Sequence, residues 1–238
     1  MSKKLILFIV EGRNDEIEIS AILHTPRFEK LSQKYAFYFY RAKNDITANA
    51  KVKSAQGELT KYVQDFRMKS GPWRGIRVDE IQEIVQVVDL DGAFIPPEHI
   101  YRGENPWFEY SNEGIYTKNV DGARGRNKKK QESLNKLVFD VKKIDNIPYS
   151  IYFVSCNMDH VLFNHRSLSP NQKSEMANRF WVQCEKHPEI VDETVFKNKV
   201  STEKGYEESW KEIQQGNESL MRHTNINLFL SEGAKNIK

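Results

Sequence analysis

Short apolar runs separated by longer polar stretches are the main pattern of this 238-residue chain. Leu5 to Val10 is continuously apolar, as in a strand covered on both faces, and Ala36 to Tyr40 (AFYFY) has the aromatic content that favours strands. The predicted strands are 5–10, 36–40, 84–88 and 150–155. Helices are predicted after Asn14 or Asp15, over 47–68 and near 128–143. This alternation predicts an α/β fold in which a mostly parallel, Rossmann-like sheet is flanked by helices.

Residues 93–127 interrupt the alternation and form a predicted insertion. They contain Pro96-Pro97, Pro106, several glycines and the start of a basic run, ARGRNKKK. A loop of that length inside a compact domain is usually functional or mobile. After residue 165 the pattern changes again, because Ser169-Pro170-Asn171-Gln172 is a capping box with proline at the first helical position. We therefore predict a domain over 1–165 and a mainly helical C-terminal extension over 166–238.

Composition narrows the class of protein only slightly. Hydrophobic residues make up 39% of the chain, enough for a real core, and the net charge is +3. The distribution of charge is more informative: residues 76–98 hold six acidic residues against one basic residue, and residues 118–143 hold nine basic residues against three acidic ones. An acidic pocket beside a basic surface is typical of sites where metal ions and polyanions meet, although solvated surfaces can have the same pattern.

Cysteine content and the N-terminal sequence favour a cytoplasmic protein. The two cysteines, Cys156 and Cys184, do not form a CxxC pair, which argues against a disulfide framework or a cysteine-rich zinc site. The apolar stretch that starts at Leu5 ends at Glu11 and is too short for a signal sequence or a membrane span. We therefore expect a cytoplasmic protein with no membrane association.

Acidic residues follow two of the predicted strands at the point where each strand ends. Glu11, Gly12 and Asp15 come after the first strand, and the stretch EIVQVVDLDGAF (83–94) ends its apolar run on Asp89 and Asp91. In a parallel sheet the carboxyl ends of the strands share one edge, where ligands usually bind. If the first and third strands are neighbours, these four carboxylates lie close together and repel one another unless they are protonated or neutralised by a cation. Hard oxygen ligands favour Mg²⁺ or Mn²⁺, which can promote hydrolysis of a phosphodiester.

The stretches LFIVEGRNDE and IVQVVDLDGAF resemble the TOPRIM domain, the catalytic fold of type IA and type II topoisomerases, bacterial primases, small maturation ribonucleases and OLD-family nucleases. The resemblance covers about residues 5–95. It implies that Glu11 is the signature glutamate, that Asp89 and Asp91 are the DxD pair, and that Asp15 is the additional acid of OLD-type nucleases. These four residues would then be both catalytic and metal-binding, with Mg²⁺ or Mn²⁺ as the cofactor.

The motifs that are not visible in the sequence narrow the resemblance to one part of that family. A topoisomerase gate would not fit in this length, a primase zinc module is not visible, and the chain contains no GxxxxGK[ST] ATPase motif. The remaining resemblance is to stand-alone TOPRIM nucleases of bacterial anti-phage and abortive-infection systems, OLD-like and RloB-like, several of which work with a separate P-loop ATPase. The stretch FVSCNMDHVLFNH loosely resembles the end of the fourth strand in RloB-like proteins but departs from their pattern.

Other candidate residues have a functional and a structural interpretation. The basic run is the best candidate for contacts with a nucleic-acid backbone, and the alternative is a solvated helix start. Its candidate residues are Arg124, Arg126, Lys128, Lys129 and Lys130. Asp159 is either a further ligand or second-shell residue or a capping residue, and His160 either orients a water molecule or has only a structural role. Trp107, Phe108 and Tyr110 either stack on unpaired bases or anchor the insertion.

Two functions remain open from the sequence. The first is a metal-dependent nuclease that hydrolyses phosphodiester bonds of DNA or RNA, tRNA included, as an effector of anti-phage defence. The second is a non-catalytic TOPRIM-like subunit that binds or regulates within an ATPase-containing complex. A homodimer is compatible with both.

Overall fold

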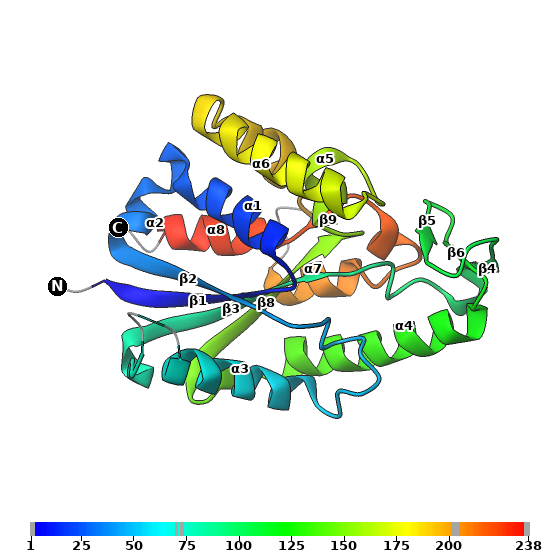
Figure 1. Cartoon of the computed structure of the whole chain (residues 1–238), viewed down its shortest axis with the longest axis horizontal. Helices are drawn as coiled ribbons and strands as arrows, with labels where there is room; N and C mark the ends of the chain where they lie inside the picture. The colour runs from blue at the N-terminus through cyan, green and yellow to red at the C-terminus, as the bar shows by residue number, and fades with distance from the viewer. Residues whose placement is uncertain (1–2, 70, 72–73, 201–204, 236–238) are drawn as a thin grey trace.

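The computed structural model describes residues 3–69, 71, 74–200 and 205–235, and these form an α/β fold around a mixed, mostly parallel sheet (Figure 1). Four parallel strands, in the order β2-β1-β3-β8, make its centre. Short antiparallel strands β7 and β9 both pair with β8. The strands of this sheet are β1 (Lys4–Val10), β2 (Tyr35–Arg41), β3 (Ile81–Asp89), β7 (Lys143–Ile144), β8 (Ile147–Ser155) and β9 (His223–Thr224). The α/β class and the four predicted strands are confirmed.

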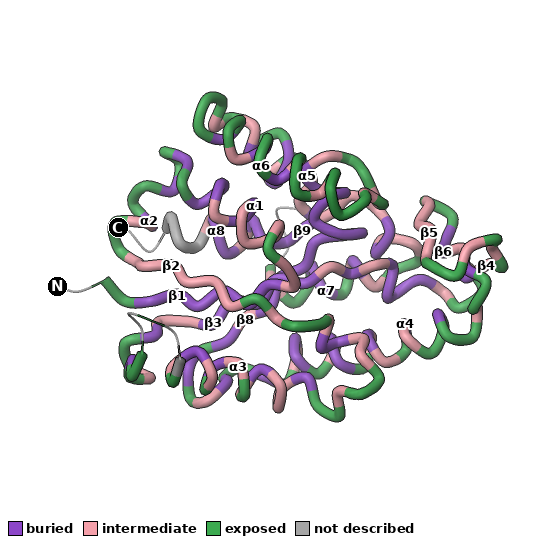
Figure 2. Tube along the Cα trace, in the orientation of Figure 1, coloured by how far each residue is buried: buried purple, intermediate pink, exposed green. Residues whose placement is uncertain are grey.

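Helices cover both faces of the sheet. Side chains alternate along β1, so that Leu5, Leu7 and Ile9 join one buried cluster and Ile6, Phe8 and Val10 join the other. The first cluster is covered by α3 (Ala55–Lys69), α4 (Val120–Asn135) and α7 (Tyr206–Glu212). The second is covered by α1 (Arg13–His24), α2 (Glu29–Lys34), α5 (Met158–Phe163), α6 (Pro170–Lys186) and α8 (Ile226–Lys235). Figure 2 shows that β1 and β8 are mostly buried, whereas β2 is only partly covered.

Short helical turns connect these elements. The 3₁₀ turns are Pro26–Phe28, Val78–Glu80, Pro97–His99 and Glu218–Leu220, and the π-helical turns are Lys136–Asp140 and Asp192–Phe196. Among the described residues, none of the helices combines the length and the apolar character that crossing a bilayer requires.

The predicted insertion is more ordered than a loop. It contains a small sheet in the order β4-β6-β5, built from β4 (Ile100–Arg102), β5 (Glu109–Tyr110) and β6 (Ile115–Thr117). The prediction of a helix near 128–143 was misplaced, because α4 begins at Val120, where the Asn119 side chain accepts a hydrogen bond from the Gly122 N–H at 2.9 Å. The basic run therefore lies within a helix rather than at the end of a loop.

Two other helices begin at residues that differ from the predicted ones. The helix predicted over 47–68 begins only at Ala55, because Asp45 holds a turn by accepting hydrogen bonds from the N–H groups of Thr47 and Ala48. Helix α1 begins at Arg13 with Gly12 as its N-cap, and Asp15 completes the capping arrangement from the first turn. The capping box at Ser169 is confirmed as the start of α6.

The residues after 165 share the core of the preceding ones. Trp210 of α7 packs edge-on against Phe153 of β8, and Phe229 of α8 packs against Phe8 of β1. Strand β9 extends the sheet beside β8. The C-terminal region thus completes both layers around the sheet instead of forming a separate core.

Candidate metal and nucleic-acid site

Glu11 and Asp89 meet at the carboxyl edge of the sheet. Strands β1 and β3 are parallel neighbours, as the argument from the sequence required, and Glu11 follows β1 directly while Asp89 is the last residue of β3. The backbone N–H of Asp89 lies 3.4 Å from Oε1 of Glu11. The side chain of Asp89 accepts a hydrogen bond from the Met158 N–H at 3.0 Å, which links this edge to the start of α5.

Asp15 reaches the same edge from the first turn of α1. Its Oδ2 accepts a hydrogen bond from the Gly12 N–H at 2.7 Å, so its position is fixed by the capping of the helix. Electrostatic interactions connect Asp15, Asp89 and Asp91 with Glu11. We call these four residues, Glu11, Asp15, Asp89 and Asp91, the carboxylate edge. The structure therefore brings together all four acidic residues predicted from the sequence.

Asp91 is held by two basic residues of α4. Arg126 donates to the carboxylate of Asp91 at 2.8 Å and to its backbone carbonyl at 2.9 Å, and Lys130 Nζ lies 3.1 Å from Oδ2 of Asp91. Lys130 is completely buried and also pairs with Asp45 at 2.8 Å. Asp45 lies in the loop after β2, so a fifth carboxylate from a third strand end belongs to the site. Sequence reasoning missed Asp45, although its place just after a predicted strand was a usable signal.

The same face of α4 fixes the loop that follows Asp91. Asn127 donates to the Gly92 carbonyl at 3.0 Å and Gln131 donates to the Ala93 carbonyl at 2.7 Å. Asp91 and Gly92 both have positive φ angles, 50° and 65°. A side chain at Gly92 would be strained, and its Cβ would also lie 2.6 Å from Leu220. This loop is therefore a rigid turn clamped by α4.

The basic run divides into two groups in the structure. Arg126 and Lys130 face Asp91, and Lys130 has no surface with which to bind a phosphate. Arg124 and Lys128 are exposed and Lys129 is partly exposed, so these three can still contact a nucleic acid. Arg124 makes a 3.2 Å hydrogen bond to the Pro97 carbonyl and a 3.5 Å ion pair with Asp121. The predicted nucleic-acid contact is thus reduced to the outer face of α4.

The carboxylates differ sharply in how well their charge is compensated. Burial and the charges of Asp45, Asp91 and Asp15 raise the pKa of Glu11 to about 8, despite Lys130. Burial and the charge of Glu11 raise the pKa of Asp89 well above its usual value, and burial also raises the pKa of Asp15. Burial opposes ionisation of Asp91 too, but Lys130 and Arg126 outweigh it and lower its pKa. For Glu11, Asp15 and Asp89, the nearby lysines do not offset the effect of burial on the charged form.

A second acidic group lies beside Asp15. Asp159, at the start of α5, is almost buried and pairs with Lys173 of α6 at 2.7 Å. Glu18, one turn after Asp15 on α1, is 1% exposed, and its Oε1 has no hydrogen-bond partner within the part of the chain that the structure describes. The sequence suggested Asp159 as a possible ligand, but Glu18 and Lys173 were missed. The only signal for Glu18 was its helical spacing from Glu11 and Asp15.

His160 has a structural role. Its ring Nδ1 accepts a hydrogen bond from the backbone N–H of Cys156 at 3.1 Å. Its backbone N–H donates to the side chain of Asn157, the N-cap of α5. Burial and the nearby charges of Arg166 and Arg222 lower its pKa to about 4. A neutral, buried histidine of this kind organises the turn after β8, which agrees with the structural interpretation of this residue.

The aromatic residues of the insertion mostly anchor it. Arg126 lies over the Phe108 ring at 5.1 Å, and both Phe108 and Tyr110 pack against a small buried cluster around Ile100. Trp107 is different because 60% of its surface is exposed. Only Trp107 of these three is free to stack on a base.

In this arrangement the acidic side chains of the site do not form a complete set of metal ligands. Among the described residues, no three His, Cys, Asp or Glu side chains are arranged to hold a metal ion. The reason is that Asp91 points to Lys130 and Arg126, Asp15 to the Gly12 N–H, and Asp159 to Lys173. Their chemistry fits a hard cation, but rotation of at least one of these side chains is required.

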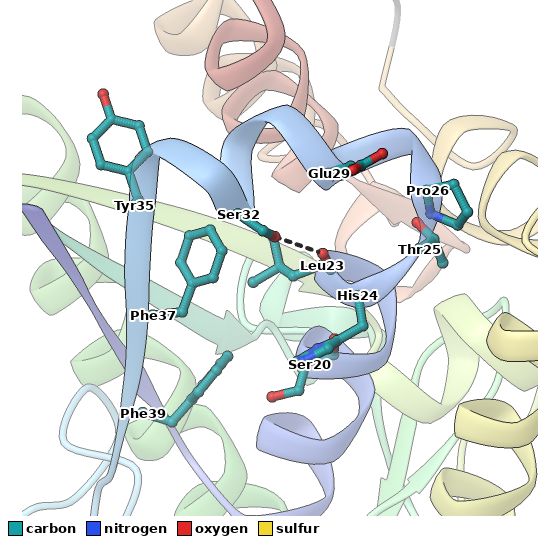
Figure 3. Close-up of a pocket in the computed structure, with 10 residues that line it drawn as sticks. All are labelled: Ser20, Leu23, His24, Thr25, Pro26, Glu29, Ser32, Tyr35, Phe37 and Phe39. Atoms are coloured by element: carbon teal, nitrogen blue, oxygen red, sulfur yellow. Dashed lines mark hydrogen bonds between the residues drawn. The ribbon is translucent and has the colours of Figure 1, made fainter. Parts of the chain in front are cut away.

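A separate groove of about 550 Å³ lies at the other end of α1 (Figure 3). Phe37 and Phe39 of β2 form one wall, and His24 and Pro26 lie at the end of α1. The four residues of the carboxylate edge are absent from its lining, so this groove is distinct from that edge.

Comparison of the chain with protein-family models, with curated proteins and with solved structures found no match in any of the three.

Proposed function

We propose that this protein is a metal-dependent nuclease that hydrolyses phosphodiester bonds of DNA or RNA, tRNA included. The observation that carries the proposal is the convergence of Glu11, Asp15, Asp89 and Asp91 at the carboxyl edge of two adjacent parallel strands. Glu11 follows the first strand and the Asp89/Asp91 pair follows the third, which are the places that the TOPRIM resemblance implies for these acids. An effector role in bacterial anti-phage defence is part of the same proposal and rests on that resemblance.

The carboxylate edge has the donor set that Mg²⁺ or Mn²⁺ prefers, which is oxygen alone. Glu11, Asp89 and Asp91 would hold the ion, with Asp15 beside them. Burial and the neighbouring acidic charges raise the pKa values of Glu11 and Asp89, and a divalent cation at this position would favour their ionised forms. A divalent cation there supplies Lewis-acid chemistry to a phosphodiester.

The remaining side chains would position the substrate and the carboxylates. Arg126, Asn127 and Gln131 bond to the backbone carbonyls of residues 91–93, so the backbone of the DxD turn is fixed before substrate binds. Lys128 and Arg124 project from the outer side of α4 and would neutralise backbone phosphates. Trp107, an exposed residue of the insertion, would stack on an unpaired base.

A second candidate function is favoured by the ion pairs of the site. Lys130 already neutralises Asp91 and Asp45, and Lys173 neutralises Asp159, so part of the acidic group is satisfied without metal. Such an arrangement would suit a non-catalytic subunit that binds or regulates within a complex with a P-loop ATPase.

A cleavage assay separates the two candidates. Purified protein is incubated with Mn²⁺ or Mg²⁺ and plasmid, single-stranded DNA or total tRNA, in parallel with Glu11→Gln and Asp89→Asn. The nuclease proposal expects metal-dependent cleavage that falls at least about a hundredfold in both variants, because each removes a ligand at the reacting centre. Glu109→Gln, a half-exposed glutamate of the insertion, is the matched control and should keep full activity. Cleavage that persists in both site variants would refute the nuclease proposal.

A further inference from the structure

The loop that joins β2 to α3 carries a second basic surface. Residues 41–53 hold four basic side chains against one acidic side chain, Asp45, which pairs with the buried Lys130 at 2.8 Å. Because Lys130 also lies 3.1 Å from Asp91, this loop is tied to the DxD turn of the carboxylate edge. Figure 1 shows the loop between the end of β2 and the start of α3, beside α4. Its basic side chains, all exposed, are Arg41, Lys43, Lys51 and Lys53.

A pocket of about 330 Å³ opens between this loop and α3. Tyr40 of β2 and Tyr62 of α3 stack in its lining, with their ring centroids 5.0 Å apart. Ile46 and Val52 of the loop add apolar surface. Lys43 also lines the pocket, and it forms no ion pair with another described residue. The pocket therefore combines a pair of aromatic rings, an apolar surface and an uncompensated ammonium.

The acidic side chains of the pocket are already bonded within it. Glu58 pairs with Lys61 at 2.7 Å, and Asp65 accepts a hydrogen bond from the Tyr40 hydroxyl at 3.1 Å. With two basic and two acidic side chains, the lining has no net charge. The chain on either side of Val52 adds two exposed lysines, Lys51 and Lys53. A ligand would thus meet an uncharged aromatic interior with positive charge next to it.

A single-stranded nucleic acid has the chemistry that matches this arrangement. A nucleobase is flat and uncharged and stacks on aromatic side chains, and the phosphates on either side of it are anionic. A base within a duplex is already stacked and paired, so it would have to leave the helix before it could enter a pocket. The pocket therefore favours an unpaired strand over a duplex.

We propose that this pocket takes one unpaired base of a single strand, stacked on the pair of Tyr40 and Tyr62, while Lys43 and Lys53 hold the adjacent phosphates. Because Lys130 ties the loop to the DxD turn, the strand is held close to the carboxylate edge. The use of the bound strand as a substrate for cleavage rests on the proposed function, whereas its binding does not.

Binding in the presence of a chelator separates this step from cleavage. The full-length protein is titrated against fluorescently labelled single-stranded DNA, single-stranded RNA and the corresponding duplexes, and anisotropy is measured. Tyr62→Leu keeps an apolar side chain but removes the aromatic face. It should weaken the binding of single strands about fivefold or more, as expected for the loss of one stacked base, and leave duplex binding unchanged.

Tyr35→Leu is the matched control, because Tyr35 is a half-buried tyrosine at the other end of β2. This variant should bind single strands like the parent, and circular dichroism checks that both variants fold. The proposal is overturned if the two variants bind single strands equally, or if Tyr62→Leu weakens duplex binding by the same factor.

The salt dependence of binding tests the phosphate contacts. Each contact contributes about 0.7 to the slope of log K against log salt concentration for a single strand, so Lys43→Gln/Lys53→Gln should reduce that slope by about 1.4. Lys30→Gln/Lys186→Gln changes the net charge equally at exposed positions of α2 and α6 and should leave the slope unchanged. Equal slopes in the two double variants would contradict the assignment of these lysines.

The cleavage assay distinguishes failure of this proposal from failure of the nuclease proposal. If Glu11→Gln and Asp89→Asn still cleave nucleic acid but Tyr62→Leu binds single strands weakly, the proposed function fails and the pocket stands. If cleavage needs Glu11 but Tyr62→Leu binds single strands like Tyr35→Leu, only the pocket fails.

Discussion

Lys128 and Lys130, two positions apart in the basic run of α4, should respond differently to the same substitution. Lys130 is completely buried and bonded to Asp45 and Asp91 at 2.8 and 3.1 Å, whereas Lys128 is exposed. Lys130→Met leaves two carboxylates in the interior with less positive charge. Removing one partner of a buried ion pair costs about 3–5 kcal/mol of unfolding free energy. Lys128→Met should change it by about 0.5 kcal/mol or less, as surface substitutions usually do.

Urea unfolding and thermal unfolding, both followed by circular dichroism, measure this difference in stability. In a chain of this length, a loss of about 3 kcal/mol lowers the melting temperature by roughly 6–12 °C. Replacing the partner charge as well, in Lys130→Met/Asp91→Asn, should recover part of the loss, with a coupling energy of about 1–3 kcal/mol. Lys128→Met should instead weaken nucleic-acid binding and reduce its dependence on salt. Equal stability of Lys130→Met and Lys128→Met would refute the arrangement of α4 described above.

Further predictions concern pH, aromatic stacking and acid stability. The pKa of Glu11 is 4.5 in the unfolded chain and about 8 in the fold, so metal-free protein should lose stability as pH rises from 5 to 8. The shift sets a limit of about 5 kcal/mol, which partial exposure of the side chain reduces to roughly 2. Urea titrations in chelator should show a smaller loss in Glu11→Gln, in which Asp15 and Asp89 still have raised pKa values. Trp107→Ala should weaken binding of single-stranded nucleic acid by about 1–3 kcal/mol in fluorescence titrations, with duplex binding and stability unchanged. Burial disfavours ionised Asp45, but Lys130 and Thr47 lower its pKa from 3.8 to about 2. Its contribution to the stability of the fold is therefore complete above pH 3.8 and is lost as pH falls through 2. The stability of Asp45→Asn should depend less on acid, as urea unfolding between about pH 2 and 5 would measure.

The strands and the carboxylate edge could be predicted from the sequence because both depend on local pattern. The run Ile84–Val88 must be buried, and acids that directly follow two buried parallel strands can only emerge at one edge. Sequence alone could not show which strands are neighbours. The pairing of β1 with β3 was a condition in the argument, and the structure confirms it.

The basic residues around the site could not be placed from pattern alone. Gly122 and Gly125 lower helix propensity, so the start of α4 was predicted eight residues too late, although Asn119 offered a capping signal. With the helix misplaced, Arg126 and Lys130 seemed to belong to an exposed run. Their spacing of four puts them on one face, but only the packing of α4 against the DxD turn shows that this face is buried.

Glu18 and Lys173 were missed for a related reason. A glutamate between two isoleucines of an amphipathic helix looks like a surface residue until another helix covers it. Helix α6, which belongs to the predicted C-terminal extension over 166–238, packs against α1. Burial of a charged residue is therefore a property of tertiary packing here, and no local window of sequence contains it.

Anomalous diffraction from a crystal grown with Mn²⁺ tests the central claim most directly. The account predicts a strong anomalous peak bound by carboxylate oxygens of Glu11, Asp89 and Asp91. A crystal that shows ordered side chains at the carboxylate edge, with Lys130 and Arg126 still on Asp91 and no peak beside Glu11 at millimolar Mn²⁺, would contradict it.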